Sequence, residues 1–176
     1  WAGMLEERTL DEIGFGVIGM GFGRSRAALL KDTPGARLVT VSSRDAAKAA
    51  VGGADARYLA GGQSLIQAMR LRLSQSERLV DLGGIADLKT IKVDASGVTI
   101  GAMATHAAVA ANADVRRAIP ALAELAGGIG DPMVRNMGTI GGSVANADPA
   151  ACYPAALIGL GATVHTNQRA IAADAF

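Results

Sequence analysis

Two glycine pairs are the residues in this chain whose type and setting could do chemistry. Gly61-Gly62 is followed by an amide and a hydroxyl side chain, and Gly141-Gly142 stands between two hydroxyls. These polar neighbours are Gln63, Ser64, Thr139 and Ser143. Backbone N–H groups that converge at a glycine loop can hold the two negative charges of a pyrophosphate, because no Cβ blocks close approach. Both pairs precede helical patterns, whose N-termini would add favourable partial charge. A single pair usually makes only a turn, so the prediction of a pyrophosphate ligand depends on finding both.

A third glycine-rich segment lies near the start of the chain. Gly19-Met20-Gly21-Phe22-Gly23 falls between a predicted strand and a predicted helix, with its third glycine displaced by one residue from the dinucleotide fingerprint. Residues 13–45 resemble the first βαβ unit of the glucose-fructose oxidoreductase-like family. Ser43-Arg44 stands where an acidic residue would bind the ribose hydroxyl, which favours NADP over NAD. The resemblance ends near Ala50, so we expect a structural βαβ piece; an NADP-dependent sugar or polyol dehydrogenase fragment is the alternative.

The rest of the chain carries several motifs in a fixed order. They are Ala60-Gly61-Gly62-Gln63-Ser64-Leu65, Met69-Arg70-Leu71-Arg72-Leu73, Ile100-Gly101-Ala102-Met103-Ala104-Thr105-His106, and residues 129–149 with Arg135-Asn136-Met137-Gly138-Thr139-Ile140-Gly141-Gly142 at their centre. In this order and spacing, residues 55–176 resemble the FAD-binding medium subunit of aerobic carbon monoxide dehydrogenase and its xanthine dehydrogenase relatives, the molybdenum hydroxylases.

That resemblance implies a cofactor, a site and partners. The cofactor would be FAD, with its pyrophosphate on the first loop and its ribityl-pyrophosphate stretch along the second. The implied cofactor-binding residues are Ala60, Gly61, Gly62, Gln63, Ser64, Leu65, Thr105, Thr139, Ile140, Gly141, Gly142, Ser143 and Asp148. The partners would be an iron-sulfur small subunit and a molybdenum large subunit, and electrons would pass from the former to an external acceptor. Substrate hydroxylation would occur in the molybdenum subunit, so no catalytic or metal-binding residue is assigned to this chain.

The sequence departs from the family pattern at two positions, and three single residues have their own expected roles. Ser143 stands where the family often has Asn, and Cys152 where it often has Asp. We expect Cys152 to be a small buried core residue. His106 is expected to be a hydrogen-bonded scaffold residue at a helix start, and His165 a surface residue.

The composition argues against several classes of function. A net charge of +1 and an aromatic content of 3% argue against nucleic acid as a partner. One cysteine excludes an internal disulfide and a cysteine-based metal cluster, which fits a reducing compartment and a cytoplasmic location. No segment reaches the ~18 apolar residues of a membrane span. Residues 1–8 lack the basic and apolar regions of a secretory signal.

Hydrophobic periodicity predicts short strands alternating with helices. The predicted strands are 13–19, 37–42, 57–60, 79–82, 89–94, 98–102, 162–166 and 169–172. The predicted helices are 24–31, 45–50, 64–71, 105–118, 120–125 and 153–160. Residues 127–142 are predicted to be loop-rich, with Asp131-Pro132 and Arg135-Asn136 shaping and capping the loop.

These elements predict a fold of the α/β to α+β class. It would join an N-terminal βαβ layer to a mixed, largely antiparallel sheet with helices, as in the FAD-binding domain of molybdenum hydroxylases. Residues 1–54 form a Rossmann-like segment in place of the usual N-terminal subdomain, and residues 55–176 form the FAD-binding region without the family's C-terminal subdomain. Two resemblances in one chain indicate a chimera, natural or engineered. A recombined domain with no activity of its own is therefore a further alternative.

Overall fold

The computed structural model describes residues 6–8, 37–40 and 55–176. The chain divides into two compact units, Trp1–Thr90 and Ile91–Phe176. The predicted strand 13–19, the turn from Gly19 to Gly23, and the helices 24–31 and 45–50 lie outside the described residues. Of the predicted βαβ layer, the described element is the strand Arg37–Thr40, which matches the prediction of 37–42.

The first unit contains a four-stranded sheet with the strand order β1-β2-β4-β3. The strands are β1 (Glu6–Arg8), β2 (Arg37–Thr40), β3 (Ala56–Leu59) and β4 (Arg78–Asp81). β4 runs parallel to both β2 and β3, and β1 pairs with β2 in the antiparallel sense. β3 and β4 are therefore joined by a crossover, which carries a helix as parallel connections usually do.

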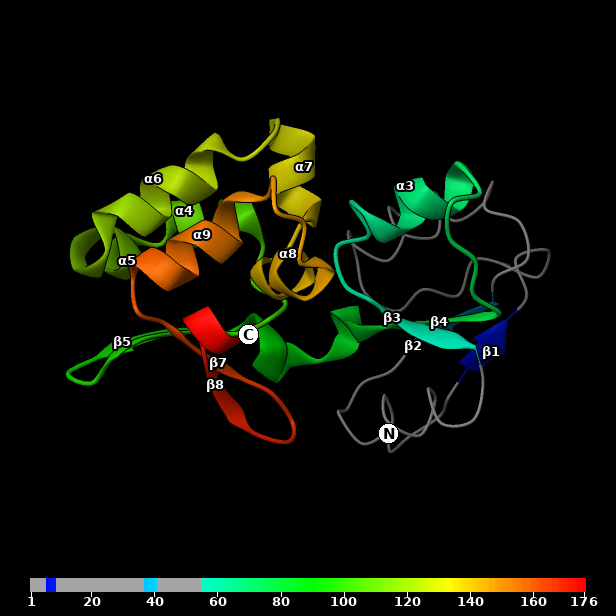
Figure 1. The fold of residues 1–176 in the computed structure, drawn as a ribbon, viewed down its shortest axis with the longest axis horizontal. Helices are drawn as coiled ribbons and strands as arrows, with labels where there is room; N and C mark the ends of the chain where they lie inside the picture. Colours follow the sequence, from blue (N-terminus) through cyan, green and yellow to red (C-terminus); the bar gives the residue numbers. More distant parts are fainter. Residues whose placement is uncertain (1–5, 9–36, 41–54) are drawn as a thin grey trace. The chain divides into compact units, whose positions relative to one another are not determined.

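That helix is α3 (Leu65–Arg70), which lies over one face of the sheet (Figure 1). Its buried residues Ile66 and Met69 pack with Leu59 of β3 and Leu79 of β4. The loop that enters α3 begins at the carboxyl end of β3, directly after Leu59. The packing of α3 on β3 and β4 thus fixes both ends of the first glycine loop. Two short 3₁₀ turns, η2 (Leu82–Gly84) and η3 (Ala86–Lys89), follow β4.

Helix α3 ends in a tight turn that an arginine closes. The N–H of Arg72 donates to the Met69 carbonyl at 2.9 Å, and that of Leu73 donates to the Ala68 carbonyl at 2.8 Å. This is the Schellman arrangement, in which the residue at the position of Arg72 takes a left-handed conformation; its φ is 59°. Glycine is the usual residue there because it has no Cβ to oppose that conformation.

We therefore expect Arg72→Gly to raise the free energy of unfolding by about 0.5–1 kcal/mol, since relief of left-handed strain outweighs the extra freedom of glycine in the unfolded chain. Arg70→Gly, in the last turn of the helix, is the matched control and should lower stability by about 1 kcal/mol. Urea denaturation of the full chain measures both. A destabilised Arg72→Gly variant would contradict the assignment of strain to this turn.

The second unit places helices on one side of a β-hairpin (Figure 1). The hairpin pairs β5 (Ile91–Asp94) with β6 (Gly97–Ile100). Alternate residues of both strands pack against the helical core: Ile91, Val93, Val98 and Ile100. The prediction of a hairpin turning at residues 95–97 is confirmed.

Six helices follow in the second unit. They are α4 (His106–Ala111), α5 (Ala113–Ala118), α6 (Pro120–Gly128), α7 (Pro132–Met137), α8 (Ile140–Asn146) and α9 (Cys152–Gly159). A second hairpin, β7 (Thr163–His165) with β8 (Ala170–Ala172), and the 3₁₀ turn η4 (Ala173–Ala175) complete the unit. The core gathers Val109, Val115, Ala126 and Tyr153, all with no exposed surface.

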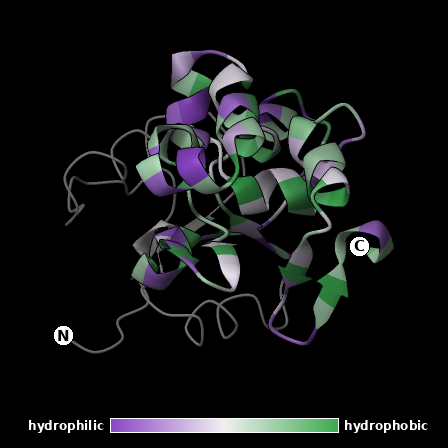
Figure 2. Ribbon diagram, turned by 90° about the vertical axis from the view of Figure 1, so that its left-hand side faces the viewer, coloured by the Kyte–Doolittle hydropathy of each residue, from purple (hydrophilic) through white to green (hydrophobic). Residues whose placement is uncertain are grey.

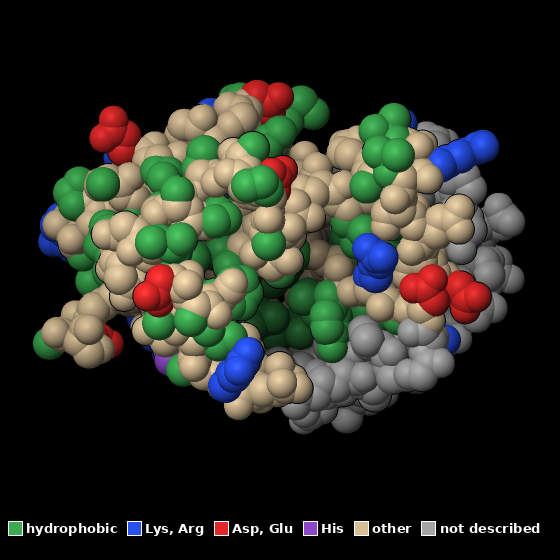
Figure 3. Space-filling model, in the orientation of Figure 1, with side chains coloured by type: hydrophobic (Ala, Val, Ile, Leu, Met, Phe, Trp, Pro, Cys, Tyr) green, Lys and Arg blue, Asp and Glu red, His purple; other side chains and the backbone are tan. Residues whose placement is uncertain are grey.

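Apolar residues are not confined to the core of this unit. β8, next to the C-terminus, is apolar throughout (Figure 2). In α9, Ile158 is 56% exposed. Figure 3 shows hydrophobic side chains at many places on the surface that faces the viewer. No helix in the described part of the chain is both long and apolar enough to cross a membrane.

Two helical predictions need correction. The single helix predicted over 105–118 is broken at Asn112, whose side chain accepts from the N–H groups of Asp114 and Val115 and so begins α5. The region 127–142, predicted to be loop-rich, is mostly helical. There α7 and α8 begin at the capping side chains of Asp131 and Thr139, and these local hydrogen bonds outweigh the low helix propensity of glycine.

Candidate functional site

The first glycine loop is shaped by Gly62. Its φ is +77°, a conformation that L side chains rarely adopt, and a Cβ there would lie 2.6 Å from Cδ1 of Ile66. The carbonyl of Gly62 accepts from the Ile66 N–H at 3.2 Å, so the loop turns directly into α3. In the described part of the chain, the backbone N–H groups from Gly62 to Leu65 have no protein acceptor. Ser64 precedes α3 without forming a side-chain cap.

The second glycine pair lies inside the first turn of α8 rather than before it. Residues 138–142 run alongside residues 101–106, and Thr105 and Thr139 form an isolated antiparallel bridge. The N–H of Ile140 donates to the Ala104 carbonyl at 3.0 Å, and that of Gly141 to the Ala102 carbonyl at 2.9 Å. A Cβ on Gly141 would lie 2.5 Å from the Ala102 Cβ. Gly141 is therefore required for close backbone approach between the two segments.

The N–H groups of this second loop are already used by the protein. Gly142 donates to the Thr139 hydroxyl at 3.1 Å, and Ser143 donates to the Thr139 carbonyl at 3.0 Å. The prediction that backbone N–H groups of both pairs converge on a pyrophosphate is wrong for this pair, because the N–H of Gly141 is used by the long-range pairing with Ala102 and that of Gly142 by the local cap at Thr139. Whether this loop contacts a cofactor through other atoms stays a prediction.

The remaining predicted residues lie at helix caps and turns. Thr105 caps α4 by accepting from the Ala108 N–H at 3.1 Å. Asp148 is exposed and accepts from the Ala150 N–H at 2.9 Å. The structure brings Thr105 next to Thr139 within the second unit, whereas Ala60–Leu65 belong to the first unit.

Of the predictions for other single residues, the one for Cys152 is wrong and those for His165 and Arg135 are confirmed. Cys152 is exposed at the start of α9, so the prediction that it is a buried core residue is wrong. The next residue, Tyr153, is the one that is buried in the core. His165 is exposed in β7, as predicted. Arg135 donates to the carbonyls of Ile129 and Gly130, which confirms its loop-shaping role.

His106 is buried at the start of α4, 5% exposed, and its N–H donates to the Gly138 carbonyl at 3.0 Å. Its ring contacts that of Tyr153, with centroids 5.3 Å apart. The predicted place at a helix start is confirmed, but the predicted side-chain hydrogen bond is wrong, because Nδ1 has no hydrogen-bond partner in the described part of the chain. Burial lowers the pKa of His106 from the ordinary 6.5, because the charged form loses solvation. Burial likewise raises the pKa of Tyr153.

The lowered pKa of His106 predicts a loss of stability in mild acid. The unfolded chain takes up the proton near pH 6.5 and the folded chain does so only at lower pH. Stability is therefore full above pH 6.5 and falls toward the folded pKa, by at most about 1.4 kcal/mol per pH unit. The urea midpoint of unfolding, measured at pH values from about 7.5 to about 5, records this loss of stability, because that range spans the ordinary His pKa. His106→Gln should flatten the slope and His165→Gln should not; an unchanged slope in His106→Gln would contradict the account.

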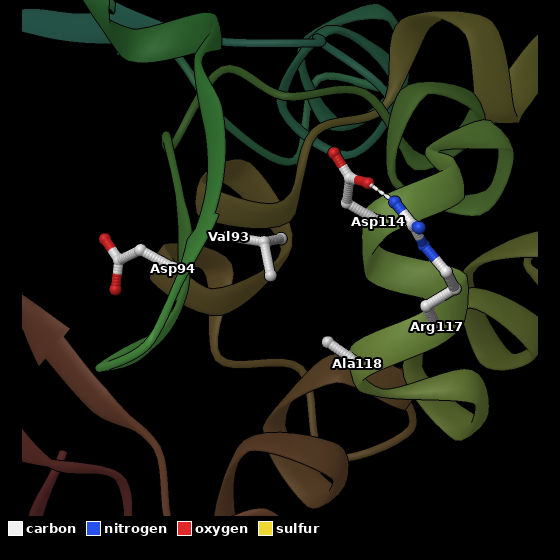
Figure 4. A pocket seen from close by; sticks show the side chains of 5 residues that line it. All are labelled: Val93, Asp94, Asp114, Arg117 and Ala118. Carbon is white, nitrogen blue, oxygen red and sulfur yellow. Dashed lines mark hydrogen bonds and ion pairs between the residues drawn. The ribbon is translucent and has the colours of Figure 1, made fainter.

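A separate hollow of about 420 Å³ lies between β5 and α5 (Figure 4). Val93 points into it, and Asp114 and Arg117 form an exposed ion pair along α5. Asp94 points away, and hydrogen bonds from Ser96 lower the pKa of its carboxyl. The hollow contains none of the predicted site residues.

Sequence reasoning missed the residues that receive the second loop. Ala102 and Ala104 supply the two carbonyls that hold Ile140 and Gly141. The small residues Gly101, Ala102 and Ala104 could have indicated a close backbone contact, although they do not indicate the partner segment.

Comparison with known proteins decides the family. The family described as "FAD binding domain in molybdopterin dehydrogenase" matches residues 35–176. The chain belongs to this family. FAD is the cofactor of such a domain, and nothing in the comparisons supports the NADP-dependent alternative.

Named relatives of this FAD-binding domain are medium chains of larger enzymes. It is 39% identical over 123 residues to the glyceraldehyde dehydrogenase medium chain of Sulfolobus acidocaldarius, covering 70% of this chain and 44% of the relative. It is 41% identical over 128 residues to the carbon monoxide dehydrogenase medium chain of Hydrogenophaga pseudoflava, covering 70% of this chain and 45% of the relative. The chain thus spans less than half of the length of these relatives.

Solved structures agree with the fold. The carbon monoxide dehydrogenase structure from Hydrogenophaga pseudoflava matches with a TM-score of 0.74 and 39% identity, over 78% of this chain and 50% of that chain. Quinoline 2-oxidoreductase from Pseudomonas putida 86 matches with a TM-score of 0.72 and 33% identity, over 76% of this chain and 49% of that chain. The predicted α/β to α+β fold of the FAD-binding domain is confirmed. In the described residues the four-stranded sheet is itself mixed, with β1 antiparallel to β2 and β4 parallel to both of its neighbours, and the other two sheets are antiparallel hairpins.

Proposed function

We propose that this FAD-binding domain is the electron-transfer module of a molybdenum-hydroxylase complex. It would relay electrons from an iron-sulfur small subunit to an external acceptor, while a molybdenum large subunit carries out the reaction on the substrate. The support is the family itself and the names of its relatives, which are medium chains or subunits of dehydrogenases.

Within the domain, we assign the FAD pyrophosphate to the loop Ala60–Leu65. The observation that carries this assignment is the loop geometry: Gly62 has a φ of +77°, and the N–H groups from Gly62 to Leu65 have no acceptor in the described part of the chain. Backbone N–H groups exposed by a glycine turn are the donors that an anionic phosphate requires. Their chemistry therefore fits the cofactor that the family implies.

The second loop has a supporting part in this proposal. Thr139, Ile140, Gly141, Gly142 and Ser143, with Thr105 and Asp148, would contact FAD through side chains and carbonyls, because the N–H groups of residues 140–143 donate within the protein. The partly exposed Ser143 hydroxyl has no hydrogen-bond partner in the described part of the chain, so it is free to donate.

When bound, the flavin supplies the redox chemistry, and the protein supplies binding and orientation. The side chains of the two loops are amides, hydroxyls and small apolar groups, none of which exchanges protons readily near neutral pH. No acid-base step is therefore assigned to this chain. A reducing, cytoplasmic location is part of the proposal, since an exposed lone thiol such as Cys152 persists best where thiols stay reduced.

The relay is tested by mixing the FAD-loaded full chain, without oxygen, with a dithionite-reduced iron-sulfur small subunit of a molybdenum hydroxylase. Rapid-mixing absorbance should show the flavin becoming reduced as the iron-sulfur signal reappears. A second mixing step with ferricyanide should reoxidise the flavin. A flavin that stays oxidised in contact with the reduced subunit would reject the relay while leaving FAD binding intact.

A further inference from the structure

His106 and Tyr153 are two buried polar side chains that lie ring to ring, one at the start of α4 and one in α9. Their centroids are 5.3 Å apart and the ring planes are tilted by 42°. They are 5% and 0% exposed, and neither Nδ1 of His106 nor Oη of Tyr153 has a hydrogen-bond partner in the described part of the chain. Unpaired buried polar atoms cost free energy, so apolar rings would fill this space more favourably. Packing of the core alone therefore does not account for the two residues.

The His106 ring also rests directly on Gly138. A Cβ built on Gly138 would lie 2.5 Å from Nε2 and 2.8 Å from Cδ2 of His106. The φ of Gly138 is −62°, which any residue can adopt, so glycine is required by the close contacts of the His106 ring and, more weakly, of the Val134 carbonyl oxygen, which would lie 3.1 Å from the Cβ. The His106 N–H donates to the Gly138 carbonyl at 3.0 Å, and the two residues are held together through side chain and backbone.

Gly138 leads directly into the second glycine loop. The next residue, Thr139, is bridged to Thr105, the residue before His106. A displacement of Gly138 is passed to Thr139 through a single planar peptide bond, and from Thr139 to Gly142 through the cap hydrogen bond. The His106 ring is thus linked to the loop through Gly138, in addition to the hydrogen bonds that Ile140 and Gly141 make with Ala104 and Ala102.

We propose that His106, whose ring contacts that of Tyr153, is a positioning residue for FAD. It holds Gly138 in place and thereby positions the turn from Thr139 to Ser143 against the cofactor. This inference rests on the proposed function, because it needs that turn to contact FAD. His106 acts through Gly138 and has no part in electron transfer itself.

The test is a double-mutant cycle on the full chain, with FAD affinity measured by flavin fluorescence and flavin geometry by visible circular dichroism. Gly138→Ala alone places a methyl group against the ring and should raise the Kd for FAD on the order of tenfold. His106→Ala alone loosens the turn and should also weaken binding. The double variant removes the two shortest contacts and leaves the Val134 carbonyl oxygen 3.1 Å from the new Cβ, so it should bind FAD more tightly than Gly138→Ala does. Effects of the two substitutions that simply multiply would overturn the inference.

Val115→Ala is the control for a merely structural effect. Val115 is fully buried in α5, and its truncation should lower the melting temperature without changing the Kd for FAD or the flavin dichroism. A Kd raised as much by Val115→Ala as by His106→Ala would overturn the inference. If the unaltered chain binds no FAD, the proposed function fails. The same four proteins are then compared by their melting temperatures, and additive changes in melting temperature would overturn the coupling between His106 and Gly138.

Discussion

Replacing Gly62 with valine is expected to abolish FAD binding by the full chain. Gly62 has a φ of +77°, and its missing Cβ would lie 2.6 Å from Cδ1 of Ile66. A β-branched residue is strongly disfavoured in that conformation, and forced backbone strain of this kind costs about 1–3 kcal/mol. The loop must change its path, which removes the convergent N–H groups that we assign to the pyrophosphate. Equilibrium dialysis with FAD measures the loss.

Gly161→Val is the matched control for Gly62→Val. Gly161 has a similar φ of +61°, but a Cβ there would meet nothing within 4 Å, and the residue lies in the turn between α9 and β7. It should carry comparable backbone strain and leave FAD affinity unchanged. Far-UV circular dichroism must show that both variants remain folded. Full FAD occupancy in a folded Gly62→Val variant would defeat the pyrophosphate assignment.

Replacing Gly141 with alanine is expected to lower the free energy of unfolding by about 3 kcal/mol. The new Cβ would lie 2.5 Å from the Cβ, 2.7 Å from the Cα and 2.7 Å from the carbonyl oxygen of Ala102. Two of these atoms are backbone, which cannot move aside as a flexible side chain does, so the pairing of residues 101–106 with 138–142 must open. Overpacking at such a position costs about 1–3 kcal/mol, and sometimes more. Thermal or urea denaturation measures the change.

The helical glycine Gly159 provides the comparison for Gly141→Ala. A Cβ on Gly159 meets nothing within 4 Å, and Gly159 is the last residue of α9. Gly159→Ala should be neutral or raise stability by up to about 1 kcal/mol, because alanine has the higher helix propensity. Equal effects at Gly141 and Gly159 would show that the contact with Ala102 does not restrict the site.

The local elements of this fold could be predicted from the sequence. Alternation over β5 and β6, with small and polar residues between them, predicted the first hairpin in the second unit. The apolar run before Gly61 and the helical spacing after Ser64 predicted that the first glycine loop joins β3 to α3. Both signals depend on residues close together in the chain, where hydrophobic periodicity is informative.

The environment of the second loop could not be predicted in this way. Residues 138–142 pair with residues 101–106, but the hydrophobic pattern of either segment does not predict which segment it pairs with. The glycines of residues 127–142 suggested loops, but capping by Asp131 and Thr139 produces short helices. The long-range pairing uses the N–H of Gly141, and the local cap at Thr139 uses that of Gly142, so neither is left for a phosphate. Sequence motifs thus identified the loop without indicating which of its atoms are free.

The most direct test of the account is the identity of any chromophore carried by the purified full chain. The visible spectrum is recorded, the chromophore is released by denaturation and identified by chromatography, and its amount is compared with that of the protein. The account predicts FAD, stoichiometric with the chain, after purification or after reconstitution with added FAD. A colourless chain whose melting temperature does not rise with added FAD would contradict it, because a ligand bound by the native state alone must raise stability.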